Sequence, residues 1–190
     1  SVRAFLANKA ANKNDIIILF SDAEELGLNG AALFVTGHPW AKEVGLVLNL
    51  EARGSAGPSY MLMETNEGNA SMVREFTKAN PGFPVSNSLM YSIYKMLPND
   101  TDLTVFREEG KIQGFNFAFI DDHFNYHTQQ DDIQHLSHTT LAHQGTYIVP
   151  LLNYFANADL NTLNSTEDYV YFNTPFYFIS YPFSWNFILV

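Results

Sequence analysis

Residues 15–30 read DIIILFSDAEELGLNG, an apolar run followed directly by acidic residues. The apolar part, residues 15–21, is rich in isoleucine and does not alternate with polar residues, which predicts a strand buried on both faces of a sheet. Glu24 and Glu25 stand side by side just beyond it. An unpaired carboxylate is costly where water is scarce, and two adjacent carboxylates resist joint ionisation unless a cation is near. The pair therefore indicates catalysis or cation binding at the end of a strand.

Two further apolar runs are followed by residues that can also bind a metal ion or take part in catalysis. Glu51 follows a second expected strand, and the sequence NYHT at residues 125–128 follows a third. In an α/β sheet, functional sites lie beyond the C-terminal ends of the strands. Carboxylate oxygens and imidazole nitrogens are ligands that zinc accepts. The residues alone thus predict Glu25, Glu51 and His127 as a zinc ligand set.

Each of these residues has a simpler interpretation when it is taken alone. Glu24 and Glu25 suit an exposed loop, and Glu51 suits a pair with Arg53 or a helix N-terminus. His127 suits an ordinary hydrogen-bonded histidine. Only their joint placement favours a site. Because adjacent side chains diverge, Glu24 is better placed as a general base that takes a proton from water than as a further ligand.

The rest of the chain alternates between strand and helix patterns. Strands are expected over residues 15–21, 44–50, 60–64 and 115–120, and helices over residues 2–11, 29–35, 67–79, 101–109 and 139–158. Residues 88–97 are expected to be helical or mixed. This order predicts an α/β fold, a three-layer α/β/α sandwich around a mainly parallel mixed sheet.

Composition narrows the class of protein. With 190 residues and 46% hydrophobic residues, the chain suits one globular domain. Its formal net charge of −10 and its lack of a basic stripe argue against nucleic acid as a partner. The absence of cysteine excludes disulfides, thiolate metal sites and a cysteine nucleophile.

The C-terminal stretch differs from the rest of the chain in composition. Residues 169–190 contain no charged residue, and ten of these positions are aromatic. A membrane-spanning helix needs about 20 apolar residues, and Pro175 and Pro182 interrupt this stretch. Dense Tyr, Phe and Trp are typical of a membrane interface. Two interpretations stay open: the tail leads into a membrane region, or it packs onto the domain.

Several strings, in order, resemble a known family. DAEELGLNGA, NLEARGSAGPS, NDTDLTVFREEG, GFNFAFI and NYHTQQDD are together similar to the zinc-dependent aminopeptidases that also include glutamate carboxypeptidases and glutaminyl cyclases, metallopeptidase family twenty-eight. The series resembles the membrane-tethered branch, which the aromatic tail also fits. On this resemblance, residues 1–165 are expected to form the C-terminal portion of a peptidase-like domain. Residues 166–190 are expected to be an aromatic, uncharged tail, for which the start of a membrane region is one of the two open interpretations.

The resemblance implies a role for each candidate residue. Glu24 is expected as the catalytic general base of an exopeptidase that cleaves N-terminal peptide bonds of peptide substrates with a zinc-activated water. Glu25 and His127 are expected to share one zinc. Glu51 is expected to bind a second zinc, at a place where many relatives use Asp. Tyr126 is expected to line the substrate pocket, and Asp102 to orient the ligands or the substrate amine.

One departure from the family pattern limits these expectations. The family has a His-x-Asp motif and a bridging Asp upstream of the Glu-Glu motif, whereas the first histidine here is His38. Two zincs are therefore expected in an intact domain, one or none in this chain, and little hydrolysis by it alone. A non-catalytic receptor or scaffold domain and a glutaminyl cyclase-like acyl transferase stay open as alternatives. The resemblance implies a membrane-associated or exported protein, with the peptidase domain on the non-cytoplasmic side and attachment through the C-terminal region.

Overall fold

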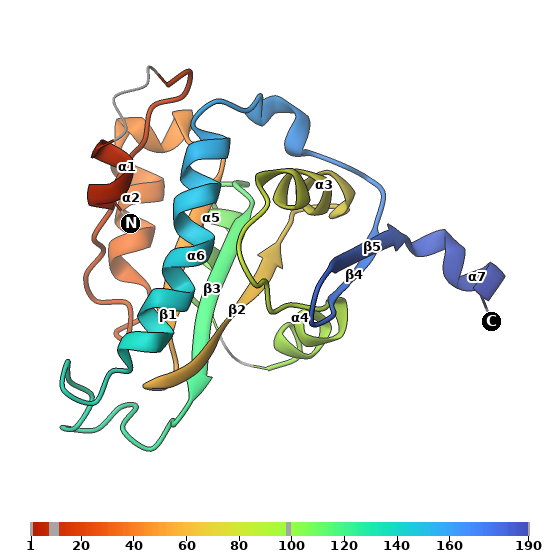
Figure 1. Cartoon of the computed structure of the whole chain (residues 1–190). Helices are drawn as coiled ribbons and strands as arrows, with labels where there is room; N and C mark the ends of the chain where they lie inside the picture. The colour runs from red at the N-terminus through yellow and green to blue at the C-terminus, as the bar shows by residue number, and fades with distance from the viewer. Residues whose placement is uncertain (1, 8–11, 98–99, 190) are drawn as a thin grey trace.

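A three-stranded mixed sheet forms the centre of the computed structural model, which describes residues 2–7, 12–97 and 100–189 (Figure 1). The strands are β1 (Val47–Ala52), β2 (Ala56–Glu64) and β3 (Gly114–Asp121), in the order β1-β3-β2. β1 runs parallel to β3, and β2 runs antiparallel to it. The parallel pairing brings the C-terminal ends of β1 and β3 to the same edge, which is the lower end of the sheet in Figure 1.

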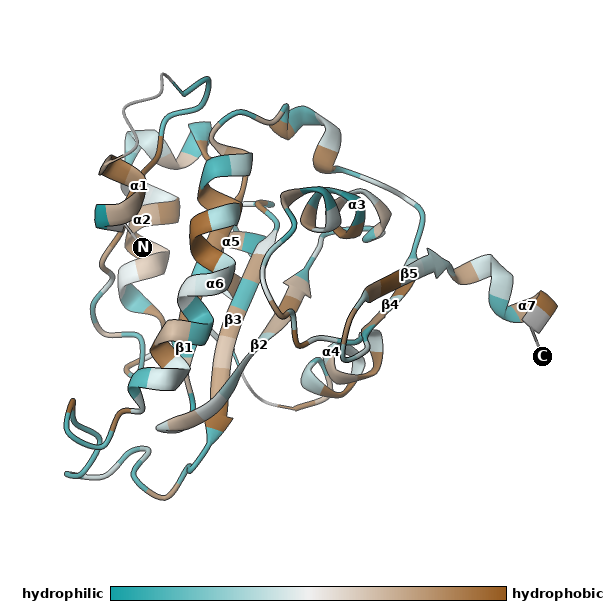
Figure 2. Cartoon of the chain, in the orientation of Figure 1, coloured by the Kyte–Doolittle hydropathy of each residue, from teal (hydrophilic) through white to brown (hydrophobic). Residues whose placement is uncertain are grey.

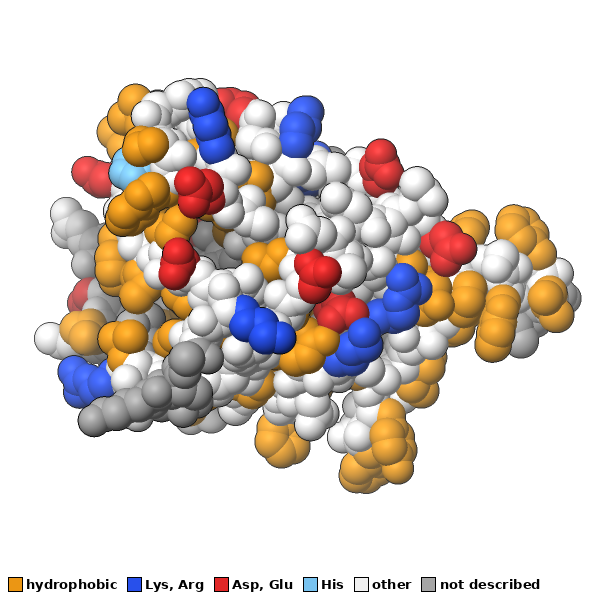
Figure 3. All heavy atoms as spheres, turned by 90° about the horizontal axis from the view of Figure 1, so that it is seen from above, with side chains coloured by type: hydrophobic (Ala, Val, Ile, Leu, Met, Phe, Trp, Pro, Cys, Tyr) orange, Lys and Arg blue, Asp and Glu red, His pale blue; other side chains and the backbone are white. Residues whose placement is uncertain are grey.

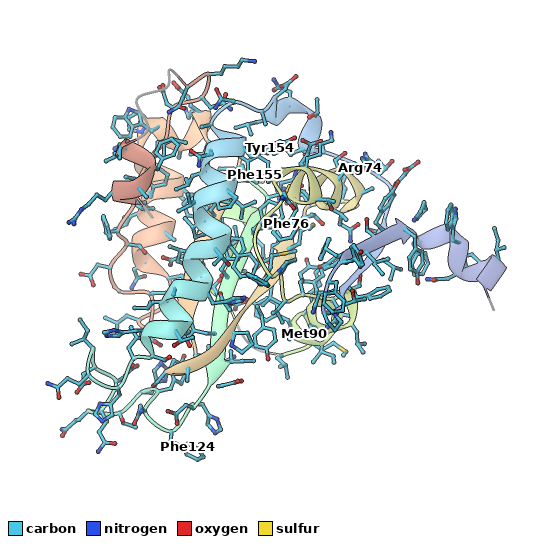
Figure 4. The ribbon with its side chains drawn as sticks, in the orientation of Figure 1. Arg74, Phe76, Met90, Phe124, Tyr154 and Phe155 are labelled. Atoms are coloured by element: carbon cyan, nitrogen blue, oxygen red, sulfur yellow. The ribbon has the colours of Figure 1, made fainter. Side chains whose placement is uncertain are left out.

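One face of the sheet is covered by α3 (Ala70–Ala79) and α6 (His138–Phe155). The Phe76 ring lies 5.5 Å from that of Phe115 and 6.5 Å from that of Tyr147, measured between centroids. Figure 4 shows Phe76 and Phe155 pointing into the space between these helices and the sheet. Burial of such rings contributes most of the stability of a core of this kind.

The opposite face is covered by α2 (Asn29–Gly37), the short helix η1 (Pro39–Glu43) and α5 (Asp102–Glu108). Phe34 and Phe106 pack against each other there, with 5.7 Å between ring centroids. The predicted three-layer α/β/α sandwich is thus confirmed. In the described residues its sheet contains one parallel and one antiparallel pair of strands.

The remaining elements lie at the ends of the chain and beside β2. They are α1 (Val2–Ala7), α4 (Ser88–Tyr94), η2 (Leu160–Leu163), the hairpin of β4 (Tyr169–Asn173) and β5 (Phe178–Pro182), η3 (Phe183–Trp185) and α7 (Asn186–Leu189). Figure 2 shows apolar colours along β3 and in the β4–β5 hairpin. Across the described parts of the chain, none of the helices combines the length and the apolar character that crossing a bilayer requires.

Most predicted elements are found within a few residues of their expected bounds. The helix expected over residues 101–109 is found as α5, and a capping box in which Thr101 and Thr104 each cap the other's backbone begins it. The helix expected over residues 2–11 is seen as α1, and residues 8–11 lie outside the described residues.

The strand predicted over residues 15–21 is wrong. This segment is extended but is not hydrogen-bonded into either sheet. Ile16, Ile17, Ile18 and Leu19 are 36–47% exposed, and Phe20 is 91% exposed. A fully buried strand needs backbone partners at its edges and apolar cover on both faces, and the described residues supply neither here.

Candidate active site

A tight turn over residues 22–28 presents Glu24 and Glu25 before α2. The backbone N–H groups of Gly27 and Leu28 donate to Glu24 O at 3.0 and 2.8 Å. Ala23 and Leu28 have φ of 58° and 59°, in the left-handed region that costs non-glycine residues energy. The sequence accommodates this bend by placing a glycine where the chain folds back on itself.

Gly30 is that glycine. Its N–H donates to Asp22 O at 3.0 Å, and a Cβ added to Gly30 would lie 2.4 Å from the same oxygen. A side chain at this position would therefore push the turn away from α2. Through this contact, a residue of the helix fixes where the two glutamates stand.

His127 meets Glu25 across the site. His127 Nε2 lies 2.6 Å from Glu25 Oε1, and the two side chains are 53% and 61% exposed. His127 has a φ of 57°, and its ring stacks on Tyr126 with 3.8 Å between centroids. The structure thus brings together the two residues that the sequence predicts as ligands of one metal ion.

Tyr126 is the third member of the cluster that Glu25 and His127 form. Arg53, in the loop after β1, lies with its Cζ 5.8 Å from the centroid of the Tyr126 ring. Burial raises the pKa of the Tyr126 hydroxyl above its ordinary value, and the charge of Glu25 raises it further. Figure 4 shows the neighbouring Phe124 in the same loop at the lower end of the sheet, pointing away from the core.

Glu51 lies at the end of β1, on the sheet face that α5 covers. Asn49 Nδ2 donates to Glu51 Oε1 at 3.0 Å and to Asn116 Oδ1 at 3.2 Å. Burial raises the pKa of Glu51 to about 7, against the opposing effect of the Asn49 hydrogen bond. The negative charges of Glu24 and Asp102 raise it further, so the three carboxylates share one electrostatic environment.

Asp102 is the first residue of α5 and lies near enough to Glu24 and Glu51 for its charge to act on both. The Ser21 hydroxyl donates to Asp102 Oδ2. Asp102 Oδ1 is buried and has no hydrogen-bond partner in the described residues. Burial raises the pKa of Glu24 above its ordinary value, and the negative charges of Glu25 and Asp102 raise the pKa of Glu24 further. The charge of His127 opposes this rise. The site therefore carries surplus negative charge that a cation would relieve.

An open hollow of about 420 Å³ adjoins the turn that carries the glutamates. It is lined by Glu24, Glu25, Gly27, Leu28 and Asp100. A carboxylate with a raised pKa therefore borders a space large enough for part of a substrate.

The donors present suit zinc in chemistry, because a carboxylate oxygen of Glu25 and an imidazole nitrogen of His127 lie next to each other. In the described residues, no group of three or more His, Cys, Asp or Glu side chains stands in position to hold a metal ion. Tetrahedral zinc places two ligand atoms about 3.3 Å apart, whereas Glu25 and His127 are 2.6 Å apart as a hydrogen-bonded pair. Opening this exposed pair by less than 1 Å would admit the ion. Glu51 is not joined to the pair.

Two contributors to the site are absent from the sequence-based prediction. Asn49 orients Glu51, and its signal was its position two residues earlier on the same strand face. Ser21 orients Asp102, and nothing in the local pattern marks a serine for that contact, because the partner lies 81 residues away.

Residues 1–152 match the family model described as Peptidase family M28. The chain therefore belongs to this family. It is 31% identical over 185 residues to a vacuolar membrane protease of Candida dubliniensis, an alignment that covers 96% of this chain and 19% of that protein. It is 29% identical over 170 residues to endoplasmic reticulum metallopeptidase 1 of Rattus norvegicus, covering 88% of this chain and 18% of that protein.

The chain thus spans about a fifth of the length of these relatives. A vacuolar membrane protease of Candida tropicalis gives a similar result, with 31% identity over 182 residues, 94% of this chain and 19% of that protein. No solved structure matches the chain. The family membership agrees with the three-layer α/β/α fold.

Proposed function

We propose that the chain is the part of a zinc-dependent exopeptidase, an aminopeptidase, that supplies the general base and metal ligands for hydrolysis of N-terminal peptide bonds. The observation that carries this proposal is the convergence of Glu25 and His127, 2.6 Å apart, beside Glu24 and a hollow that Glu24 lines. Membership of peptidase family M28 supports a hydrolase acting on peptides.

Glu25 and His127 would hold one zinc, and Glu51 would serve the second zinc of an intact domain. Zinc, when bound, supplies a Lewis acid that polarises the scissile carbonyl and acidifies water. The expectation of one zinc or none for this chain stays a prediction. The surplus of carboxylates favours divalent-cation binding here, because each added positive charge relieves their mutual repulsion.

Glu24 is assigned the proton transfer. Its raised pKa moves the carboxyl closer to the pH of reaction, where a base both stays ionised and accepts a proton effectively. Glu24 first takes a proton from the attacking water and then returns it to the leaving amine. Because Glu24 is not one of the assigned ligands, its replacement should spare metal binding.

The substrate end is assigned to Tyr126, Asp102 and the adjoining hollow. A free α-amino group is cationic near neutral pH, and Asp100, Glu24 and Glu25 present negative charge where the hollow opens. This charge favours a peptide N-terminus over an internal peptide segment. Tyr126, whose ring contacts His127 and lies near Arg53, supplies an aromatic side chain to this end of the site.

The test compares Glu24→Gln with wild type after stripping and reloading with zinc. Peptides with free, acetylated and glutaminyl N-termini serve as substrates, on this chain and on the full-length protein. The expected result is release of the first residue from the free peptide only, by the full-length protein and only slightly by this chain alone. In Glu24→Gln of the full-length protein this release should fall by about 10²–10⁴-fold at unchanged zinc content. Glu43→Gln, an exposed carboxylate at the end of η1, is the control.

Other outcomes overturn the proposal. Full activity in Glu24→Gln would remove the assigned base. Cyclisation of the glutaminyl peptide without release of residues would indicate an acyl transferase, and no turnover in the zinc-loaded full-length protein would indicate a non-catalytic domain. We further propose a membrane-associated protein, which is supported by the name of the vacuolar membrane protease relatives. That the peptidase domain lies on the non-cytoplasmic side is proposed from the family resemblance alone.

A further inference from the structure

Two uncharged segments, far apart in the sequence, form one unit beside the sheet. The 10 basic and 20 acidic residues of the chain all lie outside residues 83–94 and residues 169–189. The first segment contains α4 and the second contains the β4–β5 hairpin, η3 and α7. We call these two segments together the aromatic lobe.

Hydrogen bonds join the two segments. Ser86 N–H donates to Asn173 Oδ1 at 2.9 Å, and Asn173 N–H donates to Ser86 O at 3.1 Å. Tyr171 N–H donates to Ser88 Oγ at 2.8 Å. Tyr171 is also 1% exposed and belongs to the main core. α4 and the β4–β5 hairpin of the lobe are therefore fixed to each other and to the body of the domain.

The outer side chains of the lobe are large, apolar and in contact with water. Six of them are between 69% and 86% exposed: Phe83, Leu89, Phe176, Tyr177, Phe187 and Ile188. Single exposed apolar residues are ordinary, whereas a concentration of them marks an interaction surface. Figure 3 shows hydrophobic side chains and no acidic or basic side chains on the part of the chain that projects beyond the body on the right.

The position of the most exposed residues matters as much as their number. Phe176 and Tyr177 lie in the turn between β4 and β5, which is the tip of the hairpin. Phe187 and Ile188 lie on α7, which Figure 1 shows extending away from the sheet. Both pairs of side chains could therefore enter a neighbouring apolar layer, such as that of lipid, without unfolding of the domain.

We propose that the aromatic lobe docks on the surface of an electrically neutral lipid bilayer and inserts Phe176, Tyr177, Trp185 and Phe187 into the headgroup region. This inference deepens the membrane association proposed above and is independent of peptide hydrolysis. It adds α4 to a contact that the sequence places only in the C-terminal stretch.

The absence of charged residues from the aromatic lobe favours lipid over a polar protein as its partner. A protein interface of ordinary composition surrounds its apolar centre with charged and polar groups, and these two segments contain no charged residue over their whole length. Tyr and Trp rings, apolar at one end and polar at the other, are enriched where lipid meets water. The relatives named vacuolar membrane protease support a bilayer near this domain.

Charge also decides which lipid. The chain carries a formal net charge of −10, so an anionic surface repels the body while the lobe approaches. Binding is then driven by burial of apolar surface, which salt does not screen. We expect binding to phosphatidylcholine vesicles that changes by less than about twofold between 50 and 500 mM NaCl, and weaker binding when phosphatidylserine is added.

The two tryptophans of the chain give an internal comparison. Trp185 lies in the lobe and Trp40 in η1, and they are 52% and 57% exposed. In Trp40→Phe, where Trp185 is the only indole, vesicles should shift the emission to shorter wavelength and brominated phosphatidylcholine should quench it. In Trp185→Phe, where Trp40 remains, neither should occur.

Matched substitutions test the surface itself by vesicle sedimentation. Phe176→Ser with Phe187→Ser should lower the partition coefficient about tenfold or more. Phe20→Ser with Phe124→Ser, two phenylalanines that are 91% and 78% exposed outside the lobe, should leave it unchanged. All four side chains are exposed, so loss of folding does not confuse the comparison.

Three results would overturn the proposal. The first is no binding to phosphatidylcholine vesicles, and the second is equal loss of binding in both pairs of variants. The third is a stable dimer in solution that Phe176→Ser with Phe187→Ser dissociates, which would assign the lobe to a second copy of the chain. Peptide hydrolysis is read in a separate assay, so failure of vesicle binding leaves the peptidase proposal intact, and the reverse also holds.

Discussion

His127 Nε2 lies 2.6 Å from Glu25 Oε1, although the two residues are 102 positions apart in the sequence. Both side chains are more than half exposed. An exposed ion pair or hydrogen bond of this kind contributes little to stability, because water competes for both partners. The pair therefore contributes little to stability, and its position beside Glu24 favours the metal-binding role proposed above.

The first prediction separates stability from metal binding at this pair. His127→Ala and Glu25→Gln should each change the free energy of unfolding by less than about 1 kcal/mol. Each should weaken zinc binding about tenfold or more. Urea unfolding measures the first quantity, and titration against a zinc-buffered indicator measures the second.

A second exposed pair of similar composition is the control for this prediction. His135 Nδ1 lies 2.8 Å from Asp132 Oδ1, with both side chains 43% exposed. His135→Ala should leave both quantities unchanged. If His135→Ala weakens zinc binding as much as His127→Ala does, the assignment of His127 as a ligand is wrong.

Gly30 gives the second prediction. Gly30→Ala places a Cβ 2.4 Å from Asp22 O and 2.7 Å from Asp22 N, so the turn that carries Glu24 must shift. We expect a loss of about 1–3 kcal/mol in stability and weaker zinc binding. Gly145→Ala, in the middle of α6 with no atom within 4 Å of the added Cβ, should instead stabilise by about 0.5–1 kcal/mol. A neutral Gly30→Ala would show that the turn tolerates the side chain.

Glu51 gives a prediction about pH. Its folded-state pKa of about 7 lies above the ordinary value of 4.5, so the folded chain keeps a proton between these pH values that the unfolded chain has released. Glu51 therefore costs stability as the pH rises from 4.5 through 7, and the full cost, up to about 3 kcal/mol, is present above pH 7. Binding of a cation would remove this cost.

The measurement is urea unfolding of wild type and Glu51→Gln at several pH values with a chelator present. The variant should be more stable than wild type at pH 8 and equal to it near pH 4. Glu43→Gln, which alters an exposed carboxylate, should follow wild type. Parallel pH profiles of wild type and Glu51→Gln would contradict the burial of Glu51 as a charged group.

The fourth prediction concerns a buried ion pair on α5. Arg107 Nε lies 3.0 Å from Glu64 Oε2, and the Glu64 side chain is 3% exposed. Arg107→Met leaves that carboxylate buried without its partner, which should cost about 3–5 kcal/mol at pH 8. Burial raises the pKa of Glu64, so the loss should shrink at low pH, where Glu64 takes up a proton.

A double variant decides whether the uncompensated charge is the cause. Adding Glu64→Gln to Arg107→Met removes the buried charge and should restore most of the lost stability, as measured by thermal unfolding at pH 8. If the double variant is as unstable as Arg107→Met, the loss comes from the packing of the arginine side chain instead.

The pattern of the sequence located the helices and β1–β3 because their signals are local. Thr101 marks the start of α5, and the apolar spacing of Met72, Val73 and Phe76 marks α3, since capping and periodicity depend on residues a few positions apart. The wrong strand over residues 15–21 has the same cause in reverse. A run of isoleucines indicates that a segment favours a buried strand. Whether it becomes one depends on packing partners that lie elsewhere in the chain.

The sequence by itself determined the layered α/β class, the strand ends that carry Glu51 and His127, and the surplus of negative charge. Only the tertiary structure decided which of these groups meet. The contact of His127 with Glu25, that of Ser21 with Asp102 and the union of α4 with the β4–β5 hairpin each join residues more than 80 positions apart. Hydrogen bonding and burial act over a few ångströms, so such contacts depend on the packing of the whole domain.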